Sequence, residues 1–377
     1  MRGVVARAGA LTVEELPEPR PGPGQVLVAP VACGICGSDL HTLELQAALP
    51  DALGPMVMGH EFCAEVLELG ADADRGIGPG TLVCSVPYVD GPAGPELVGL
   101  SPTFVGGFAE RMVLQADRLL RVPDGLDPAA ASVTEPLAVG IHAVAAARLA
   151  ADDVPLVLGC GPVGLAVIAA LRIGGHRPVV VSDYSAARRA LAERAGADVV
   201  VDPASDDPFA SWLPLTGAPV PPSPLQAPGT PPPRAVVFDC VGAPGMTASI
   251  IEAAPAHTRI VVAGVCAVPD SYVPVQALQK ELSMQYVFAY RPEEYARALH
   301  LIATRAIDVR PWITGSCDLD GVADAFGALA DPEQHCKIIV DPGAAPTRTA
   351  VTKADEVVAS TSPADGAGDP APIGSRP

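Results

Sequence analysis

Residues 154–171, VPLVLGCGPVGLAVIAAL, decide the fold of this chain. An apolar run of strand length comes first, and Gly159, Gly161 and Gly164 follow it in the spacing G-x-G-x-x-G. Pro162 suits the first turn of a helix, where a missing backbone N–H leaves no hydrogen bond unmade. Strand, glycine turn and helix in this order are the fingerprint of a dinucleotide-binding unit, whose helix N-terminus faces the pyrophosphate of the cofactor.

A membrane span is the alternative interpretation of this apolar stretch, which has 18 residues and no charge. Five of these residues are glycine or proline, which divides the stretch into strand, turn and helix. The N-terminus lacks the apolar region and cleavage pattern of a secretory signal, and the nine scattered cysteines do not form a disulfide framework. We therefore expect a cytoplasmic protein without a membrane-spanning segment.

A second apolar run, at residues 179–181, ends in Ser182 and Asp183, about twenty residues beyond the glycines. A carboxylate at this place can accept hydrogen bonds from both ribose hydroxyls of the adenosine half, and its charge repels a 2′-phosphate. The sequence therefore favours NAD over NADP. Two later apolar runs end in residues that we expect to line the nicotinamide half, although core positions explain those residues equally well. The predicted cofactor-binding residues are Gly159, Gly161, Pro162, Val163, Gly164, Asp183, Cys240, Val241, Gly264 and Val265.

The chain divides into modules with different patterns. Short apolar runs between turns indicate a β-rich module over residues 1–150. Over residues 151–290, apolar runs of strand length alternate with helical stretches, which is typical of a parallel sheet with crossover helices. Helical and short strand patterns alternate again over residues 291–341. Specific expectations are strands at 26–28, 62–69, 81–86 and 109–114 and helices at 206–213, 292–303 and 319–330.

Two segments fit neither module. Nine of the twenty residues at 214–233 are proline and none is charged, which predicts a loop of polyproline II character in place of most of a crossover helix. The tail at 342–377 contains no aromatic residue and is rich in small and polar residues, so its burial cannot offset the entropy of ordering it. We expect the tail to be disordered.

Residues 33–41, CGICGSDLH, contain a CxxC pair that by itself fits a redox pair, half of a zinc knuckle or two buried thiols. His60 and Glu61 follow about twenty residues later, and Glu135 lies further along the chain. One thiolate, one imidazole and carboxylates at long separations are typical of a catalytic zinc site with an open position. In isolation, His60 could equally be a hydrogen-bonded core histidine and Glu135 an acid at a helix N-terminus.

The motifs GICGSDLH, GHE, GGFAE, EPLAV and GCGPVGL, in this order, resemble those of the zinc-dependent medium-chain dehydrogenase/reductase superfamily over residues 4–342. Glu135 stands where the alcohol dehydrogenases proper place a second cysteine, so the chain is most similar to the sorbitol, threonine and butanediol dehydrogenase branch. The resemblance implies a GroES-like catalytic domain over residues 1–150, to which residues 291–341 return, beside an NAD-binding Rossmann domain over residues 151–290. It also implies a catalytic zinc, NAD(H) as cofactor and a homodimer or homotetramer.

The resemblance implies roles for single residues. The implied zinc ligands are Cys36, His60 and either Glu135 or Glu61, the latter a ligand in some states of the metal. Asp39 matches the acid that hydrogen-bonds the zinc histidine and orients its ring, whereas Ser38 and His41 match a proton relay. Many relatives bind a structural zinc with four closely spaced cysteines, but this chain has no cysteine over residues 85–159. We therefore predict one zinc per subunit.

The implied reaction transfers a hydride between a secondary alcohol or polyol, or its carbonyl counterpart, and NAD. One alternative is a zinc-free, NADP-linked quinone or enone reductase on the same fold, which would not need Cys36, His60 and Glu135 together and is opposed by Asp183. A catalytically silent scaffold is a second alternative, but none of the ligand or relay residues is missing.

Charge and apolar pattern indicate the partners. Against 43 acidic residues stand 24 basic ones, and the net charge of -19 repels phosphate backbones and anionic lipid. We expect a small-molecule substrate, and neither nucleic acid nor a membrane as partner. Residues 282–290, LSMQYVFAY, form a β-prone apolar stretch that would pair with its copy in a second subunit if it lies at a sheet edge. An internal strand is the alternative.

Overall fold

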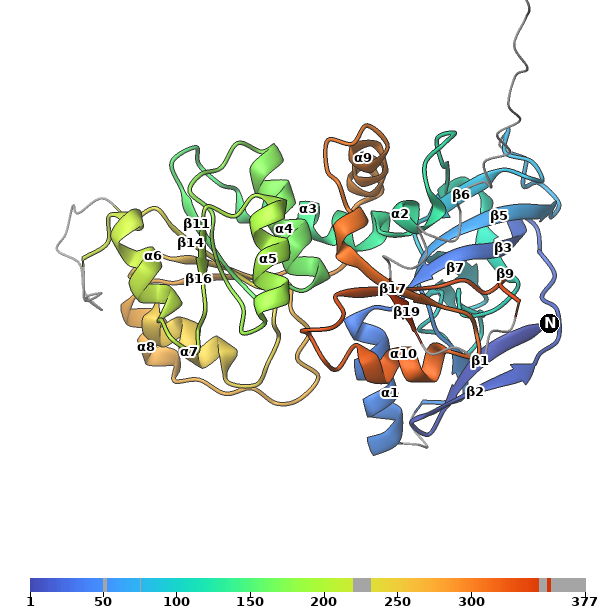
Figure 1. Ribbon diagram of the computed structural model, residues 1–377, viewed down its shortest axis with the longest axis horizontal. Coiled ribbons are helices and arrows are strands. Elements are labelled where there is room, and N and C mark those ends of the chain that lie inside the picture. Colours follow the sequence, from blue (N-terminus) through green and yellow to red (C-terminus); the bar gives the residue numbers. More distant parts are fainter. Residues whose placement is uncertain (50–52, 75, 220–231, 346–350, 354–377) are drawn as a thin grey trace, which may run out of the picture.

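The computed structural model describes residues 1–49, 53–74, 76–219, 232–345 and 351–353. Figure 1 shows a sheet with its helices at the left and a β-rich part at the right. Three helices lie between the two parts: α2 (Pro128–Ser132), α3 (Thr134–Ala147) and α9 (Pro292–Ala303). The prediction of an α/β fold with a second, β-rich unit is confirmed.

The sheet at the left has six strands in the order β13-β12-β11-β14-β15-β16, and all of their pairings are parallel. The strands are β11 (Val154–Leu158), β12 (Val180–Ser182), β13 (Val199–Val201), β14 (Ala235–Asp239), β15 (Arg259–Val262) and β16 (Ser283–Tyr286). The order reverses between β11 and β14. Doubly wound folds bind their ligands at such a point, outside the carboxyl ends of the strands.

Helix α4 (Pro162–Ile173) follows β11 as the glycine pattern predicts. Gly161 is its N-cap residue, and Pro162 is its first residue. All residues from 164 to 171 are buried, because α3 covers the side of the helix that the sheet does not. The stretch that has the length of a membrane span is therefore a strand, a turn and a core helix.

The other helices of this part are α5 (Ala186–Ala195), α6 (Pro208–Thr216), α7 (Met246–Ala253) and α8 (Pro274–Gln279). Asp207 caps α6 as expected. The helix continues through Pro214, so the prediction of a loop from residue 214 onward is wrong for its first residues. Trp212 explains the difference, because its buried indole donates a hydrogen bond of 2.9 Å to the carbonyl of Val154 and ties this turn to the sheet. Residues 220–231 of the proline-rich segment lie outside the described residues.

The β-rich part contains an eight-stranded sheet in the order β10-β6-β5-β3-β18-β17-β19, with β9 paired to β3. Its strands are β3 (Gln25–Gly34), β5 (Glu61–Leu69), β6 (Leu82–Ser85), β9 (Met112–Gln115), β10 (Leu119–Arg121), β17 (Ile313–Cys317), β18 (Lys337–Val340) and β19 (Thr352–Lys353). A smaller sheet and a hairpin pack beside it: β1 (Arg2–Arg7), β2 (Ala10–Glu15) and β4 (Met56–Val57), and β7 (Tyr88–Gly91) with β8 (Gly94–Leu97). The short helices are α1 (Gly37–Ala48), α10 (Val322–Ala328), η1 (Ala116–Arg118) and η2 (Arg310–Trp312).

The last part of the chain crosses back to this sheet. Strand β18 pairs antiparallel with β3, so that Val340 lies opposite Cys33 and Ile339 opposite Gly34. Helix α10 is shorter than the pattern at 319–330 predicts, because Gly321 closes a turn onto Asp318 before the helix begins. Strand β9 also starts later than expected at 109–114, since its first residues form only an isolated bridge.

The tail differs from the prediction of disorder throughout 342–377. Thr352 and Lys353 form β19, which pairs antiparallel with β17. The edge of β17 presents unpaired backbone groups, and a short strand can satisfy them without the apolar side chains that the prediction required. The rest of the tail beyond residue 345, except Val351, lies outside the described residues.

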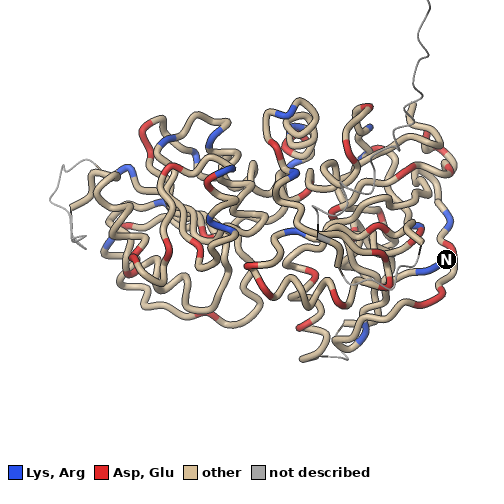
Figure 2. The backbone as a smooth tube through the Cα atoms, in the orientation of Figure 1, with Lys and Arg blue, Asp and Glu red and all other residues tan. Residues whose placement is uncertain are grey.

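One helical run, Pro128–Ala147, is long and apolar enough to cross a membrane. This run comprises α2 and α3, and 67% of its most apolar 18-residue stretch is buried inside the molecule. It packs against α4, α9 and the β-rich sheet, which identifies it as a core helix. Acidic and basic positions are interspersed over both parts of the molecule in Figure 2.

Candidate metal centre and cofactor site

Three side chains with metal-binding atoms meet where the β-rich part faces the parallel sheet. The thiol of Cys36, the imidazole of His60 and the carboxylate of Glu61 have ligand atoms that all lie within 4.8 Å of one another. Within the described residues this is the one group of three or more such side chains. Thiolate, imidazole and carboxylate are ligands that zinc prefers, so the donor set fits this metal.

Local structure places these side chains. Cys36 is the N-cap residue of α1, and its backbone N–H donates a hydrogen bond of 2.9 Å to the carboxylate of Asp39. His60 and Glu61 follow Gly59, which has a φ of +99°. A Cβ atom at Gly59 would lie 2.8 Å from the ring of Phe108 and 2.9 Å from the sulfur of Cys33. The glycine of the GHE motif is therefore needed for the turn that delivers the histidine.

Asp39 orients the imidazole of His60. Its Oδ1 atom lies 3.5 Å from the Nδ1 atom of His60, and both side chains are buried. Burial lowers the pKa of His60, but the neighbouring Asp39 and Cys36 outweigh it and raise this pKa well above its ordinary value. A carboxylate beside Nδ1 favours the proton on that nitrogen, which leaves Nε2 for a metal.

Lys337 is the main residue of this site that sequence reasoning missed. Its Nζ atom lies 2.8 Å and 2.6 Å from the two carboxylate oxygens of Glu61 and donates a third hydrogen bond to the carbonyl of Ile35. Lys337 and Glu61 are each 1% exposed. Burial lowers the pKa of Lys337, but Glu61 more than compensates and raises it. A single lysine in the apolar run CKIIV is the only signal that the sequence offered.

Glu135 lies beside the group of three but does not belong to it. It is in the first turn of α3 and is 7% exposed. Burial, helped by the charge of Glu61 and opposed by that of His60, raises the pKa of Glu135 to about 7. The buried hydroxyl of Tyr290, another residue that the sequence did not single out, lies next to this carboxylate. The geometry therefore favours Glu61 over Glu135 as the third ligand.

The two residues that are predicted to form a proton relay lie on one face of α1. The hydroxyl of Ser38 is 3.4 Å from Nε2 of His60, at the inner end of this face. His41 lies one turn later, with its side chain 42% exposed and its Nδ1 atom 3.5 Å from Glu44. The pair thus leads from the buried imidazole to the solvent. Cys33 is fully buried, and burial raises the pKa of its thiol well above the ordinary value, which keeps it protonated.

The glycine turn after β11 has the geometry of a dinucleotide site. Gly159 has a φ of +87°, and a Cβ atom at Gly164 would lie only 1.9 Å from the carbonyl oxygen of Gly159. A Cβ atom at Gly161 would meet only the guanidinium of Arg188, at 3.9 Å, so the space in front of this residue is open. Val163 follows in the first turn of α4.

Asp183 stands at the carboxyl end of β12, next to this turn. Its Oδ2 atom accepts a hydrogen bond of 2.7 Å from the N–H of Cys160, and its Oδ1 atom accepts one of 2.8 Å from the N–H of Ser185. The carboxylate is half-buried and therefore remains reachable. The structure brings the glycines and Asp183 together as the sequence predicts.

The ends of β14 and β15 lie beside the same turn. The carbonyl of Asp239 accepts hydrogen bonds from the residue before Gly264 and from Gly264 itself. Val241 is 41% exposed and Val265 is 50% exposed, whereas Cys240 is partly buried against Gly164. Exposure at the carboxyl edge of the sheet is what a ligand-lining role requires.

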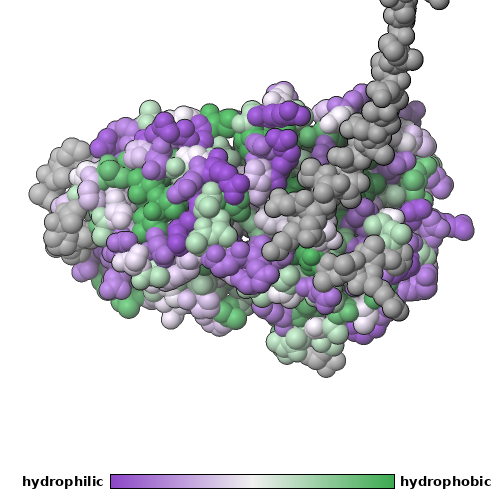
Figure 3. Space-filling model, viewed as in Figure 1, coloured by the Kyte–Doolittle hydropathy of each residue, from purple (hydrophilic) through white to green (hydrophobic). Residues whose placement is uncertain are grey.

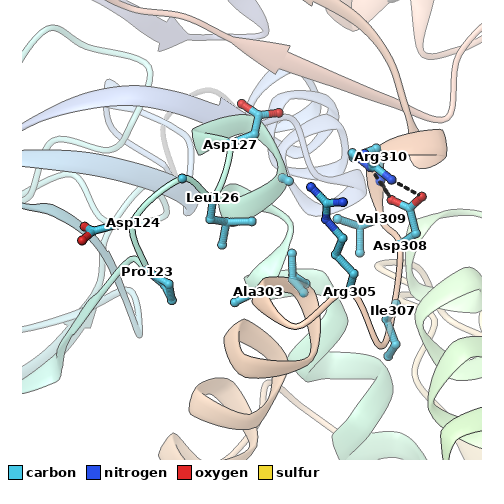
Figure 4. Close-up of a pocket in the computed structure, with 13 residues that line it drawn as sticks. Pro123, Asp124, Leu126, Asp127, Ala303, Arg305, Ile307, Asp308, Val309 and Arg310 are labelled. Carbon is cyan, nitrogen blue, oxygen red and sulfur yellow. Dashed lines mark hydrogen bonds and ion pairs between the residues drawn. The ribbon is translucent and has the colours of Figure 1, made fainter.

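A pocket of about 300 Å³ lies elsewhere, between the loop at 123–127 and the segment at 302–310. Figure 4 shows the Arg305 guanidinium pointing into this pocket, whereas Arg310 is paired with Asp308. None of the predicted site residues lines it. The pocket is therefore separate from the candidate metal centre.

Comparison with known proteins agrees with this geometry. Residues 22–124 match the family model of the alcohol dehydrogenase GroES-like domain, and residues 162–304 match that of the zinc-binding dehydrogenases. The chain is 28% identical to (R,R)-butanediol dehydrogenase of Bacillus subtilis (strain 168), with 88% of this chain and 96% of that protein covered. It is 29% identical to sorbitol dehydrogenase of Ovis aries, with 86% and 91% covered.

A solved structure of a butanediol dehydrogenase is also similar to this chain. The crystal structure of 2R,3R-butanediol dehydrogenase from Bacillus subtilis matches with a TM-score of 0.75 at 27% identity and covers 91% of this chain and 99% of that one. Fold and site together define a zinc- and NAD(H)-dependent oxidoreductase. The chain belongs to the zinc-dependent medium-chain dehydrogenase/reductase superfamily, as its motifs indicate.

Proposed function

We propose that this protein oxidises a secondary alcohol within a diol or polyol, or reduces its carbonyl counterpart, with NAD(H) as cofactor. The observation that carries the proposal is the meeting of Cys36, His60 and Glu61 beside the Ser38 hydroxyl. Relatives named butanediol dehydrogenase and sorbitol dehydrogenase support the substrate class. Glu135 supplies a further buried carboxylate that could bind a second hydroxyl of the substrate.

The site residues have separate roles in the proposed reaction. Cys36, His60 and Glu61 would hold one zinc, which when bound lowers the pKa of the substrate hydroxyl, while NAD accepts the hydride. Asp39 holds the imidazole in its orientation. Ser38 would take the hydroxyl proton, and His41 would pass it to solvent.

The cofactor would lie across the carboxyl edge of the parallel sheet. We assign the pyrophosphate to the turn of Gly159, Gly161, Pro162, Val163 and Gly164 and the adenosine ribose to Asp183. The nicotinamide half is assigned to Cys240, Val241, Gly264 and Val265. Residues 1–150 and 291–341 would form the catalytic domain and residues 151–290 the NAD domain; the pairing of β18 with β3 supports this division.

A second copy of this chain is the proposed macromolecular partner. Strand β16 is an edge of the six-stranded sheet, which argues against the alternative of an internal strand. In the face shown by Figure 3, hydrophobic side chains gather over this sheet. The exposed large apolar residues of the chain segment 265–288, which includes β16, are Val265, Val268, Tyr272, Val273, Val275, Leu278, Tyr286 and Phe288. An unpaired edge with apolar flanks favours a homodimer, or a tetramer built from dimers.

We also infer a cytoplasmic location. All nine cysteines lie in the described part of the chain and are free thiols, most of them buried. Free thiols in this number are typical of a reducing compartment.

Two measurements test the proposed function together. Metal analysis of the purified protein should give one zinc per chain, and NAD reduction should be seen in a screen of vicinal diols, polyols, simple secondary alcohols and threonine. Activity with NADPH and enones in a zinc-free protein would establish the reductase alternative instead. Bound zinc and NAD without turnover on any of these substrates would favour the silent scaffold.

A further inference from the structure

A loop from the last part of the chain lies on the first turn of α5, next to the proposed cofactor site. Glu333 Oε1 accepts a hydrogen bond of 2.7 Å from the N–H of Ala186, and its Oε2 atom accepts one of 3.2 Å from the N–H of Ala187. The Ser185 hydroxyl donates to the carbonyl of Pro332 at 3.0 Å. Three hydrogen bonds thus attach this loop, which precedes β18, to the start of α5.

The attachment point is the turn that carries Asp183. Ser185 donates its backbone N–H to Asp183 and its hydroxyl to the loop, so it connects the two. Arg189 holds the turn from the other side, with hydrogen bonds of 2.8 Å and 2.7 Å to the carbonyls of Asp183 and Tyr184. Glu333 therefore lies on the residues that immediately follow the proposed ribose-binding carboxylate.

The charges around this turn disfavour a further anion. The neighbouring Ser185 hydroxyl and the two helix amides lower the pKa of Glu333 from its ordinary value, so Glu333 is ionised at neutral pH. Arg189 is engaged by Asp202 at 2.8 Å. Arg188 remains as the cation of the turn without an ion pair among the described residues. Two acidic side chains, Asp183 and Glu333, are thus bound to the backbone of this turn, which holds one arginine without an ion pair among the described residues.

We propose that Glu333 is a second determinant of cofactor preference, contributed by the catalytic part of the chain. Its anchored carboxylate disfavours the 2′-phosphate of NADP beside Asp183, and the same hydrogen bonds position the ribose-binding turn. The proposal rests on the NAD site of the proposed function. It adds that the choice between NAD and NADP depends on a loop that is more than 140 residues from the ribose-binding turn in sequence, as the separation of Ala186 and Glu333 shows.

The test measures dinucleotide binding rather than turnover. Fluorescence titrations with NADH and NADPH at one low ionic strength would compare the wild type with Glu333→Gln and Glu333→Ala. The control is Glu193→Gln, which removes an equal charge from an exposed position on α5, beyond its first turn. We expect the ratio of the NADPH to the NADH dissociation constant to fall about fivefold in both Glu333 variants and to stay unchanged in the control.

Three outcomes would overturn the proposal. The ratio is unchanged in both Glu333 variants, or it falls as much in Glu193→Gln, or both dissociation constants rise by the same factor because the loop only supports the turn. A wild type that binds NADH but oxidises no alcohol would contradict the proposed function and leave this test intact, since the titration needs no turnover.

Discussion

The ammonium group of Lys337 lies 2.6 Å from Oε2 of Glu61 and thereby binds one of the three side chains of the candidate metal centre. The pair joins β18, near the end of the chain, to the start of β5. Both groups are buried, and the carbonyl of Ile35 accepts the remaining hydrogen bond that the structure gives to the ammonium group. The orientation of a metal-binding carboxylate therefore depends on a residue 276 positions away.

Replacing Lys337 by Met should destabilise the protein by about 3–5 kcal/mol, because Glu61 would be left as an uncompensated buried charge. Denaturant unfolding monitored by fluorescence measures the change. Lys337→Arg keeps the charge and should recover most of the loss. Equal stability of Lys337→Met and the wild type would show that the ion pair makes no net contribution.

Removing the Cys36 thiol should reduce bound zinc from one per chain to a small fraction and abolish turnover, since an open site has only three protein ligands. Metal analysis after dialysis measures the stoichiometry. Cys33→Ala is the matched control, because that thiol is buried three residues away and stays protonated. Full zinc content in Cys36→Ala would exclude this residue as a ligand.

Asp183→Ala should weaken NAD binding and improve NADP binding, because it removes both the acceptor for the ribose hydroxyls and the charge that repels a 2′-phosphate. We expect at least a tenfold change in the ratio of kcat/KM for the two cofactors, equivalent to about 1.4 kcal/mol. Steady-state kinetics with one alcohol substrate measure it. A wild type that already prefers NADP would refute the ribose assignment.

The raised pKa of Glu135 should make the metal-free protein less stable as the pH rises, because the buried carboxyl then loses its proton. Because burial raises the folded-state pKa of Glu135 to about 7, the folded state binds more protons than the unfolded state between the ordinary carboxyl pKa and about 7. This contribution is complete below that window and is lost as the pH rises through about 7. Unfolding of chelator-treated protein from pH 5 to 8 measures it, and Glu135→Gln should show a smaller decline. An identical decline in this variant would mean that other groups cause it.

A charge placed in the exposed apolar surface near β16 should dissociate the proposed dimer. Phe288 is 78% exposed, and Phe288→Asp would put a carboxylate into a contact that otherwise excludes water. Light scattering at micromolar concentration should report a dimer or tetramer for the wild type and a monomer for the variant. Leu49→Asp, at a 53% exposed leucine after α1, is the control and should not change the mass. A monomeric wild type with full activity would contradict the assembly.

Sequence reasoning succeeded where the chemistry is local in the chain. The turn from Gly159 to Gly164 and the start of α1 at Cys36 depend on backbone conformations and hydrogen bonds that span a few residues. Motifs with such short-range requirements reveal the fold class and indicate the candidate site residues. The parallel arrangement of the sheet could likewise be predicted, because apolar runs of strand length alternate with helical stretches along the chain.

Tertiary structure alone decided the contacts that join distant segments. The pairing of β18 with β3 brings Lys337 to Glu61, and the loop before it carries Glu333 to α5; no periodicity in the sequence encodes either meeting. The same holds for β19, where an open sheet edge rather than apolar content orders two residues of the tail. Which carboxylate joins Cys36 and His60 is likewise a matter of packing, because Glu61 and Glu135 are chemically alike and differ only in where the fold holds them.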